Sequence, residues 1–248
     1  MIPKWYKLTK MKKNRVCVVI PCYKVKDKII SVLKKIDFKT IDNVIIVDDF
    51  CPEYSGKFVK KNFRSSKISF IFLKKNEGVG GATIAGFQLA KQKNFDVVIK
   101  LDGDGQHDPK ILKKFIKILS SEKYDFCKGY RNLDIFIEDD MPITRKIGNI
   151  SLTFISRIIT GYYSLMDVTN GMVGLRISKF DLINFAIIKK NFFFEQDLIF
   201  HLSLKKFKFY QLKTPTIYED EKSNLRPFKS ILPFAIWHLK NLIYRILN

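Results

Sequence analysis

Short apolar runs alternate with amphipathic segments along the first half of this chain. The runs are rich in Val and Ile and lie at residues 16–20, 44–47, 68–73, 97–101 and, more weakly, 126–128. Between them, apolar residues recur with helical spacing at residues 26–35, 55–63, 80–91 and 109–119. Strands that alternate with helices of this length predict βαβ units, and therefore an α/β fold with a mostly parallel sheet flanked by helices.

Two carboxylates, Asp102 and Asp104, directly follow the apolar run at 97–101. A buried parallel strand delivers its last side chains to the carboxyl edge of an open α/β sheet, where ligands bind. Paired hard oxygens with room for water suit Mg²⁺ or Mn²⁺, which complete their coordination shell with phosphate oxygens. The sequence therefore predicts a divalent metal site at Asp102 and Asp104. The alternative is an acidic turn that only caps the next helix.

Polar or small residues also follow the other predicted strands. Asn76, Gly78 and Gly80 stand where a helix begins, and a helix start offers unpaired N–H groups and a positive dipole end to a phosphate. A tight strand-to-helix turn is the alternative for these glycines. The remaining strand-end residues are Pro21, Tyr23, Asp48 and Asp49. Because the carboxyl ends of parallel strands meet at one edge, a single pocket there is expected to hold a base, a ribose and a metal-bound diphosphate.

Composition limits the possible partners. The chain has 248 residues, 46% of them hydrophobic, which is enough to bury one sizeable core. Its formal net charge of +21 predicts an anionic partner: lipid headgroups, a phosphorylated substrate or nucleic acid. No helix-turn-helix, RNP or zinc-finger pattern is present, so nucleic-acid binding is a distant alternative and we expect no such partner. The cysteines lack C-x-x-C spacing and no signal peptide is visible, so we expect a cytoplasmic protein.

The C-terminal segment has the pattern of an amphipathic helix. From Pro227 to Asn248 the apolar residues cover a wide helical arc, and no acidic residue follows Glu221. Trp237 and Tyr244 lie at the borders of this arc. A basic helix with flanking aromatic residues is typical of a helix that lies in an anionic membrane interface. A helix docked on the sheet is the alternative.

A series of short motifs occurs in order along most of the chain. They are VIPCY at 19–23, VDD at 47–49, NEGVGGA at 76–82, DGDGQ at 102–106, DVTNG at 167–171, FFEQD at 193–197 and YEDEKSNL at 218–225. This set resembles the family 2 glycosyltransferases with the GT-A (Rossmann-like) fold. Within them it is similar to the dolichyl-phosphate mannosyltransferase-like branch, in the bacterial form associated with surface glycan synthesis. The resemblance implies a GT-A domain over residues 1–225, followed by the amphipathic helix at 226–248.

The resemblance also implies an activity and a set of site residues. It implies an inverting hexosyltransferase that moves a sugar from a nucleotide-sugar donor to a polyprenyl phosphate, assisted by Mg²⁺ or Mn²⁺. Asp104 is then the catalytic metal ligand, with Asp102 beside it near the ribose and diphosphate. The donor is expected to contact Pro21, Tyr23, Asp48, Asp49, Asn76, Gly78, Gly80, Asp102 and Gln106. Lys24 and Val25 stand where the family often has Asn-Glu, so the identity of the base is left open.

The acceptor decides whether the enzyme needs a base. A sugar hydroxyl, as in glycan assembly, needs a positioned carboxylate, for which the family motif favours Asp197, with Glu195 second. Two positions apart on a helix, these side chains point about 200° apart, so one alone can face the pocket. A lipid phosphate is already ionised and needs no strong base. Arg145 and Lys146 are expected to bind that phosphate, with the protein peripheral on the inner face of the cell membrane.

Overall fold

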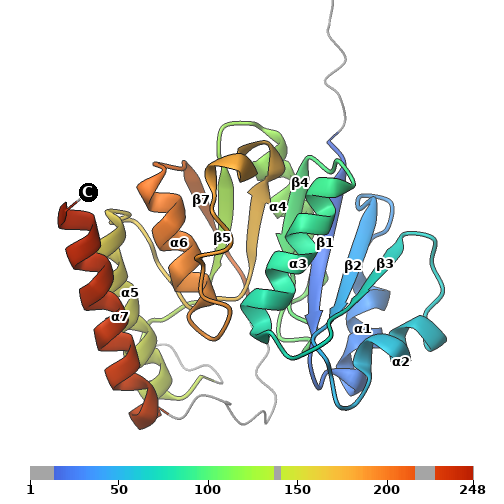
Figure 1. Ribbon diagram of the computed structural model, residues 1–248, viewed down its shortest axis with the longest axis horizontal. Coiled ribbons are helices and arrows are strands. Elements are labelled where there is room, and N and C mark those ends of the chain that lie inside the picture. Colours follow the sequence, from blue (N-terminus) through green and yellow to red (C-terminus); the bar gives the residue numbers. More distant parts are fainter. Residues whose placement is uncertain (1–13, 137–140, 216–226, 248) are drawn as a thin grey trace, which may run out of the picture.

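In the computed structural model, residues 14–136, 141–215 and 227–247 are described, and their strands form one seven-stranded sheet (Figure 1). The strands are β1 (Val16–Cys22), β2 (Asn43–Asp48), β3 (Ile68–Phe72), β4 (Val97–Lys100), β5 (Phe126–Tyr130), β6 (Val173–Arg176) and β7 (Phe209–Lys213). Their order across the sheet is β3-β2-β1-β4-β6-β5-β7. All neighbours are parallel except β6, which runs antiparallel to both β4 and β5. The predicted mostly parallel α/β sheet is confirmed.

Helices cover both faces of this sheet. They are α1 (Lys26–Lys35), α2 (Ser55–Asn62), α3 (Gly78–Gln92), α4 (Leu112–Ser120), α5 (Ile143–Thr160), α6 (Phe194–Leu204) and α7 (Pro227–Leu247). Alternate residues of β1 belong to different cores: Cys17 and Val19 pack with α3 and α6, whereas Val18 and Ile20 pack with α1, α2 and α4. Burial on both faces explains why these strands are apolar throughout rather than alternating.

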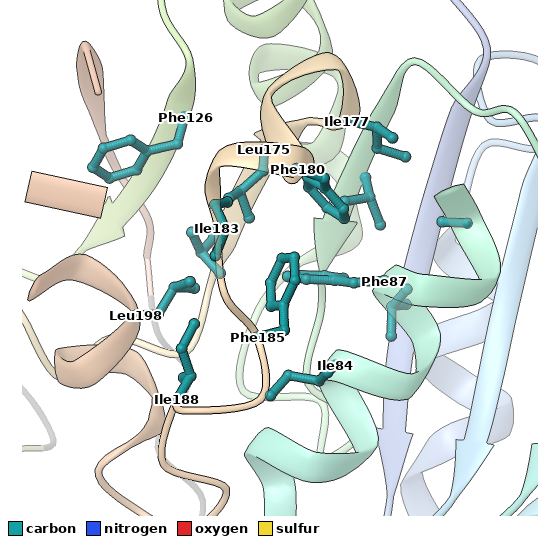
Figure 2. Packing of buried hydrophobic residues seen from close by; sticks show 14 of the residues in the cluster. Ile84, Phe87, Phe126, Leu175, Ile177, Phe180, Ile183, Phe185, Ile188 and Leu198 are labelled. Atoms are coloured by element: carbon teal, nitrogen blue, oxygen red, sulfur yellow. The ribbon is translucent and has the colours of Figure 1, made fainter. Parts of the chain in front are cut away.

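An aromatic cluster fixes the segment that leads from β6 to α6. Figure 2 shows Phe87 of α3 beside Phe180 and Phe185 of this segment. The three ring centroids lie 5.0 to 6.4 Å apart, within the range of favourable aromatic pairs. Phe87 is fully buried. The cluster therefore holds the start of α6, and with it the FFEQD motif, in a defined position against α3.

The last helix, α7, is present as predicted and lies beside α5 at one end of the molecule (Figure 1). Trp237 and His238 are buried, and Trp237 packs with Phe193 and Phe200 at and within α6. The opposite side of α7 exposes Leu239 and Ile243. The helix thus docks on the domain through one side and presents an apolar surface on the other. None of the helices that the structure describes is long and apolar enough to cross a bilayer.

Candidate active site

The polar strand ends meet at the carboxyl edge of β2, β1 and β4, as the sequence predicts. Cys22 at the end of β1 pairs with Asp48 at the end of β2, and the Asp49 N–H donates to the Cys22 carbonyl at 3.1 Å. On the other side of β1, the N–H of Leu101 donates to the Val19 carbonyl at 3.0 Å. The acidic pair after β2 and the carboxylates after β4 therefore share one edge, with β1 between them.

Asp48 and Asp49 are both buried and both accept main-chain hydrogen bonds. The oxygens of Asp48 accept from the N–H groups of Cys51 at 2.8 Å and Gly56 at 2.7 Å, and Oδ1 of Asp49 accepts from Glu77 at 2.7 Å. Burial raises the pKa of the Asp49 carboxyl, opposed by its hydrogen bonds from the Glu77 and Gly78 backbone. These side chains fix the loops that follow β2 and precede α3, so any bond to a nucleoside would use their remaining lone pairs.

The segments that follow β1 and β2 carry three aromatic residues. Pro21 is buried within β1, whereas Tyr23, Phe50 and Tyr54 are exposed. Phe50 and Tyr54 have φ values of 51° and 56°, a left-handed conformation that is an outlier for bulky residues. Phe50 and Tyr54 were not predicted as site residues, because left-handed backbone at a non-glycine residue has no sequence signature.

Lys100, the last residue of β4, lies under the site and joins three elements. Its Nζ is 2.6 Å from Oδ1 of Asp102, 3.1 Å from Oε1 of Glu195 on α6 and 3.0 Å from the carbonyl of Gly171. The lysine is buried, and burial alone would lower its pKa. The charges of the two carboxylates outweigh burial and raise the pKa of Lys100, so the ammonium form is held in place.

Asp102 and Asp104 offer a donor set that fits a Mg²⁺ or Mn²⁺ ion. Burial would raise the pKa of Asp102, but the charge of Lys100, with His107 and a hydrogen bond from Lys100, lowers it, so the carboxylate is ionised. Oδ1 of Asp104 accepts the Gln106 N–H at 3.0 Å. Among the described residues, no three His, Cys, Asp or Glu side chains gather into a cage. Few carboxylates with positions left for phosphate and water suit these hard ions.

The DVTNG motif contributes a close approach to Asp102. A Cβ on Gly171 would collide with Oδ2 of Asp102, so glycine alone fits there. The neighbouring Asn170 donates to Oγ1 of Thr214 at 3.0 Å, and its carbonyl accepts a hydrogen bond from the buried Lys128. Burial lowers the pKa of Lys128 to about 8. The motif thus packs the loop before β6 against the floor of the site.

Glu195 and Asp197 point to different places, as their helical spacing predicts. Glu195 contacts Lys100 in the site. Asp197 accepts hydrogen bonds from the Lys189 N–H at 2.7 Å and from Nε1 of Trp237 on α7 at 3.0 Å. Glu195 therefore lies beside Lys100, whereas Asp197 ties α6 to α7, and the preference for Asp197 as the base stays a prediction.

The glycines of the NEGVGGA motif have a different use from the one expected. The Gly80 N–H donates to the carbonyl of Lys190 at 2.8 Å, and the Gly78 N–H donates to the side chain of Asn76 at 3.1 Å. A Cβ on Gly78 would lie 2.6 Å from the Lys190 carbonyl, and one on Gly80 would lie 2.7 Å from Phe194. Here the glycines permit close packing against the start of α6, and the expected phosphate cradle is not open at these N–H groups.

A groove of about 270 Å³ lies between the end of β5 and α5. Arg131 and Arg157 line it together with Ile150 and Phe154. The predicted phosphate residues are elsewhere: Lys146 is buried and donates to the Asp134 carbonyl at 3.1 Å, and Arg145 and Lys146 do not line the groove. Arg131 directly follows β5 as Asp49 directly follows β2, so the same strand-end rule would have found it.

Arg131 is held by a buried, two-pronged ion pair with Asp167. Its Nε is 2.7 Å from Oδ2 and its Nη2 is 3.0 Å from Oδ1 of that carboxylate. Burial would raise the pKa of Asp167, but the charge of Arg131 and its hydrogen bonds lower it to about 2. Asp167 belongs to the DVTNG motif and is fully buried. The motif at 218–225 lies outside the described residues.

Comparisons with known proteins identify the family of this chain. The sequence model of the family described as glycosyl transferase family 2 matches residues 17–190 of this chain. The chain is 31% identical over 172 residues to the UDP-N-acetylglucosamine–dolichyl-phosphate N-acetylglucosaminyltransferase of Methanococcus voltae, covering 64% of this chain and 67% of that protein. It is 26% identical over 189 residues to the undecaprenyl-phosphate mannosyltransferase of Micrococcus luteus, covering 75% and 76%. The resemblance inferred from the motifs is confirmed.

Solved structures show the same architecture. Glucosyl-3-phosphoglycerate synthase from Mycobacterium tuberculosis, in complex with Mn²⁺, UDP and glucosyl-3-phosphoglycerate, superposes with a TM-score of 0.65 at 14% identity, over 94% of this chain and 80% of that one. At this identity the similarity concerns the fold alone, and it is that of a GT-A domain. This chain belongs to glycosyl transferase family 2 and is a nucleotide-sugar-dependent glycosyltransferase.

Proposed function

We propose that this chain transfers a sugar from a nucleotide sugar to a polyprenyl phosphate, with inversion at the anomeric carbon. The observation that carries the proposal is the groove that Arg131, after β5, lines together with Arg157 and the apolar Ile150 and Phe154 of α5. Guanidinium groups bind phosphate in a forked geometry, and the apolar wall suits a hydrocarbon chain. The curated relatives that act on dolichyl and undecaprenyl phosphate support the same acceptor class.

Different residues would bind the nucleotide-sugar donor and the acceptor phosphate. A divalent ion held by Asp104, with Asp102 beside it, would neutralise the diphosphate as it leaves. The carboxyl edge of β1 and β2, with Asp49 and Tyr23, would hold the nucleoside. Arg131, kept rigid by Asp167, would hold the acceptor phosphate on the opposite side of the sugar. Direct attack of a phosphate oxygen at the anomeric carbon inverts its configuration, and the nucleoside diphosphate departs.

The direct test is a donor screen. Purified protein with Mg²⁺ or Mn²⁺ is given each nucleotide sugar together with polyprenyl phosphate or simple sugars, and nucleoside diphosphate release is followed. We expect release to rise when polyprenyl phosphate is added and to stay at the hydrolysis rate with sugars. Release that rises with a sugar acceptor and not with the lipid phosphate would contradict the proposal.

The second candidate is transfer to a sugar hydroxyl, and the position of Glu195 favours it. Its carboxylate faces Asp102 across Lys100 and is mostly buried, as a general base would be. A hydroxyl needs such a base, whose loss typically costs on the order of 10²–10⁴ in rate, whereas an ionised phosphate does not. The two functions therefore differ in how much they need this carboxylate.

Glu195→Gln should reduce transfer to polyprenyl phosphate by less than about tenfold, because the acceptor needs no base. The measurement is the steady-state rate at pH 7 with saturating metal and donor. Asp197→Asn is the matched control, since it removes a neighbouring carboxylate that faces α7 instead of the site. A loss of more than about 10²-fold in Glu195→Gln, with nucleotide binding retained, would contradict transfer without a carboxylate base.

We further propose that α5 and α7 attach the protein to the inner face of the cell membrane. Both helices expose large apolar side chains: Ile143, Ile147, Ile150, Phe154 and Ile158 on α5, and Leu239, Ile243, Ile246 and Leu247 on α7. Arg145 and Lys240 lie on the same two helices and add attraction to anionic lipid of about 1 kcal/mol each near the surface. The groove of Arg131 opens beside α5, where a membrane-bound acceptor would arrive.

The double variant Leu239→Glu/Ile243→Glu should bind anionic vesicles at least tenfold more weakly than the wild type. These side chains are 59% and 47% exposed, so the fold does not need them, while burying one such side chain in the interface contributes roughly 1.5–3 kcal/mol. Co-sedimentation with vesicles measures the change. Ile187→Glu, an equally exposed apolar position before α6, is the control. Equal sedimentation of the double variant and wild type would place the membrane contact elsewhere.

A further inference from the structure

Lys100 places an ammonium group against Asp102, one of the two carboxylates that would hold a divalent ion. Three of its contacts are acceptors: Oδ1 of Asp102 at 2.6 Å, the Gly171 carbonyl at 3.0 Å and Oε1 of Glu195 at 3.1 Å. An ammonium has three donors, and this arrangement uses all of them. Two carboxylates and a carbonyl around a cation form a small coordination shell built from β4, the loop before β6, and α6.

The shell limits what Asp102 can offer to a metal. Its Oδ1 is 2.6 Å from the ammonium, and its Oδ2 lies against the backbone of Gly171. Asp104 accepts a hydrogen bond from its own loop, from the N–H of Gln106 at 3.0 Å. A metal ion at this edge would therefore share Asp102 with Lys100 and depend mainly on Asp104 and the diphosphate.

Burying the charged side chain of Lys100 costs free energy, so a lysine at this position calls for a functional explanation. It lies in a run that is otherwise apolar, Val97 to Leu101, and its side chain is almost fully buried. A buried ion cluster often contributes no net stability compared with apolar residues of similar size. Its effect on the charges of the site is therefore a more direct explanation for a lysine at this position than stability is.

We propose that Lys100 is a positioning residue that holds Asp102 and Glu195 and weakens the hold of the site on its divalent ion. This inference rests on the proposed function, because it assumes a metal-bound diphosphate at Asp102 and Asp104. With Asp102 shared, Asp102 and Asp104 would hold a divalent ion well only together with the diphosphate of the nucleotide, and would release it more readily with the nucleoside diphosphate. Product release limits turnover in many enzymes, so a weaker hold on the ion favours repeated turnover.

The test is the affinity for Mn²⁺ of the whole protein, measured by calorimetry or electron paramagnetic resonance at pH 8 with and without nucleoside diphosphate. Lys100→Met should bind Mn²⁺ on the order of tenfold more tightly, since a positive charge a few ångströms from a divalent ion is removed. In Lys100→Met, the Mn²⁺ concentration that half-saturates transfer should fall in parallel. The steady-state rate of transfer should then be lower than the rate of the first turnover, because product release becomes slower. A lysine with only a structural role would weaken Mn²⁺ binding when lost.

Two further variants keep the result interpretable. Lys128→Met removes another buried lysine, which donates to a backbone carbonyl rather than to a carboxylate, and it should change Mn²⁺ affinity much less. If Lys100→Met fails to fold, Lys100→Met/Glu195→Gln removes one charge of each sign and should still bind Mn²⁺ more tightly than Glu195→Gln alone. Folded variants with unchanged or weaker Mn²⁺ binding would overturn the inference. Failure of the wild type to bind Mn²⁺ with any nucleoside diphosphate would overturn the proposed function as well.

Discussion

Asp104→Asn should reduce sugar transfer by on the order of 10²–10³-fold or more while the protein stays folded. A neutral amide binds a divalent cation poorly, so the charge of the leaving diphosphate would no longer be neutralised. The fold should persist because an Asn oxygen can still accept the Gln106 N–H that Oδ1 of Asp104 accepts at 3.0 Å. Initial rates at saturating donor, with a titration of Mg²⁺ or Mn²⁺, measure the loss.

A neighbouring carboxylate provides the control for Asp104→Asn. Asp108 accepts the Lys110 N–H at 3.0 Å at the start of the next helix, so it makes the same kind of loop bond. Asp108→Asn should keep transfer close to the wild-type rate. If Asp104→Asn turns over normally once metal is saturating, Asp104 has no part in the mechanism.

Asp167→Asn should lower the free energy of unfolding by roughly 3–5 kcal/mol, the cost of breaking a buried ion pair. The variant keeps the shape of the side chain but leaves the guanidinium of Arg131 without its two-pronged carboxylate partner. Chemical denaturation at pH 7 measures the difference. Asp181→Asn is the control, because its ion pair with Lys91 is exposed and should contribute under about 1 kcal/mol. A loss below 1 kcal/mol in Asp167→Asn would show that Arg131 finds another partner.

The same ion pair predicts how stability depends on acid. The folded pKa of Asp167 is about 2, below its ordinary value of 3.8, so the folded state favours the ionised carboxylate. Its contribution is fully present above about pH 4 and is lost as the pH falls toward 2, with a size of about 2 kcal/mol. Denaturation curves at pH 5, 4 and 3 should show this loss in the wild type and a smaller loss in Asp167→Asn. Parallel curves would contradict the assignment.

The fold was predictable where one rule acts alone. Apolar runs bounded by helical periodicity gave the strands from β1 to β5, because buried parallel strands are apolar on both faces. β6 and β7 were missed: β6 is four residues long, contains Gly174 and runs antiparallel, so neither length nor composition distinguishes it. Its direction depends on where the chain returns to the sheet, and this is a property of the whole molecule.

The sequence predicted that the site lies at the carboxyl edge of the sheet, but not which side chains face one another there. Asp48, Asp49, Asp102 and Asp104 meet there because each follows a strand. The sequence could not show which of Glu195 and Asp197 lies beside Lys100, because this depends on the rotation of α6, which Trp237 and the Phe87 cluster set through tertiary packing. The glycines of α3 were read as ligand contacts, but close approach to a backbone serves packing equally well.

The hydrogen bond from Trp237 to Asp197 joins residues forty positions apart and has a consequence for synthesis of the chain. Because the ribosome delivers the chain from its N-terminus, the buried carboxylate of Asp197 is made before its indole partner. The sheet of β1 to β4, whose pairings with one another all lie among residues 16–100, can form earlier. The part of the sheet with Asp48 and Asp102 at its edge is thus expected to fold first, and α6 becomes fixed only when α7 emerges and closes over it.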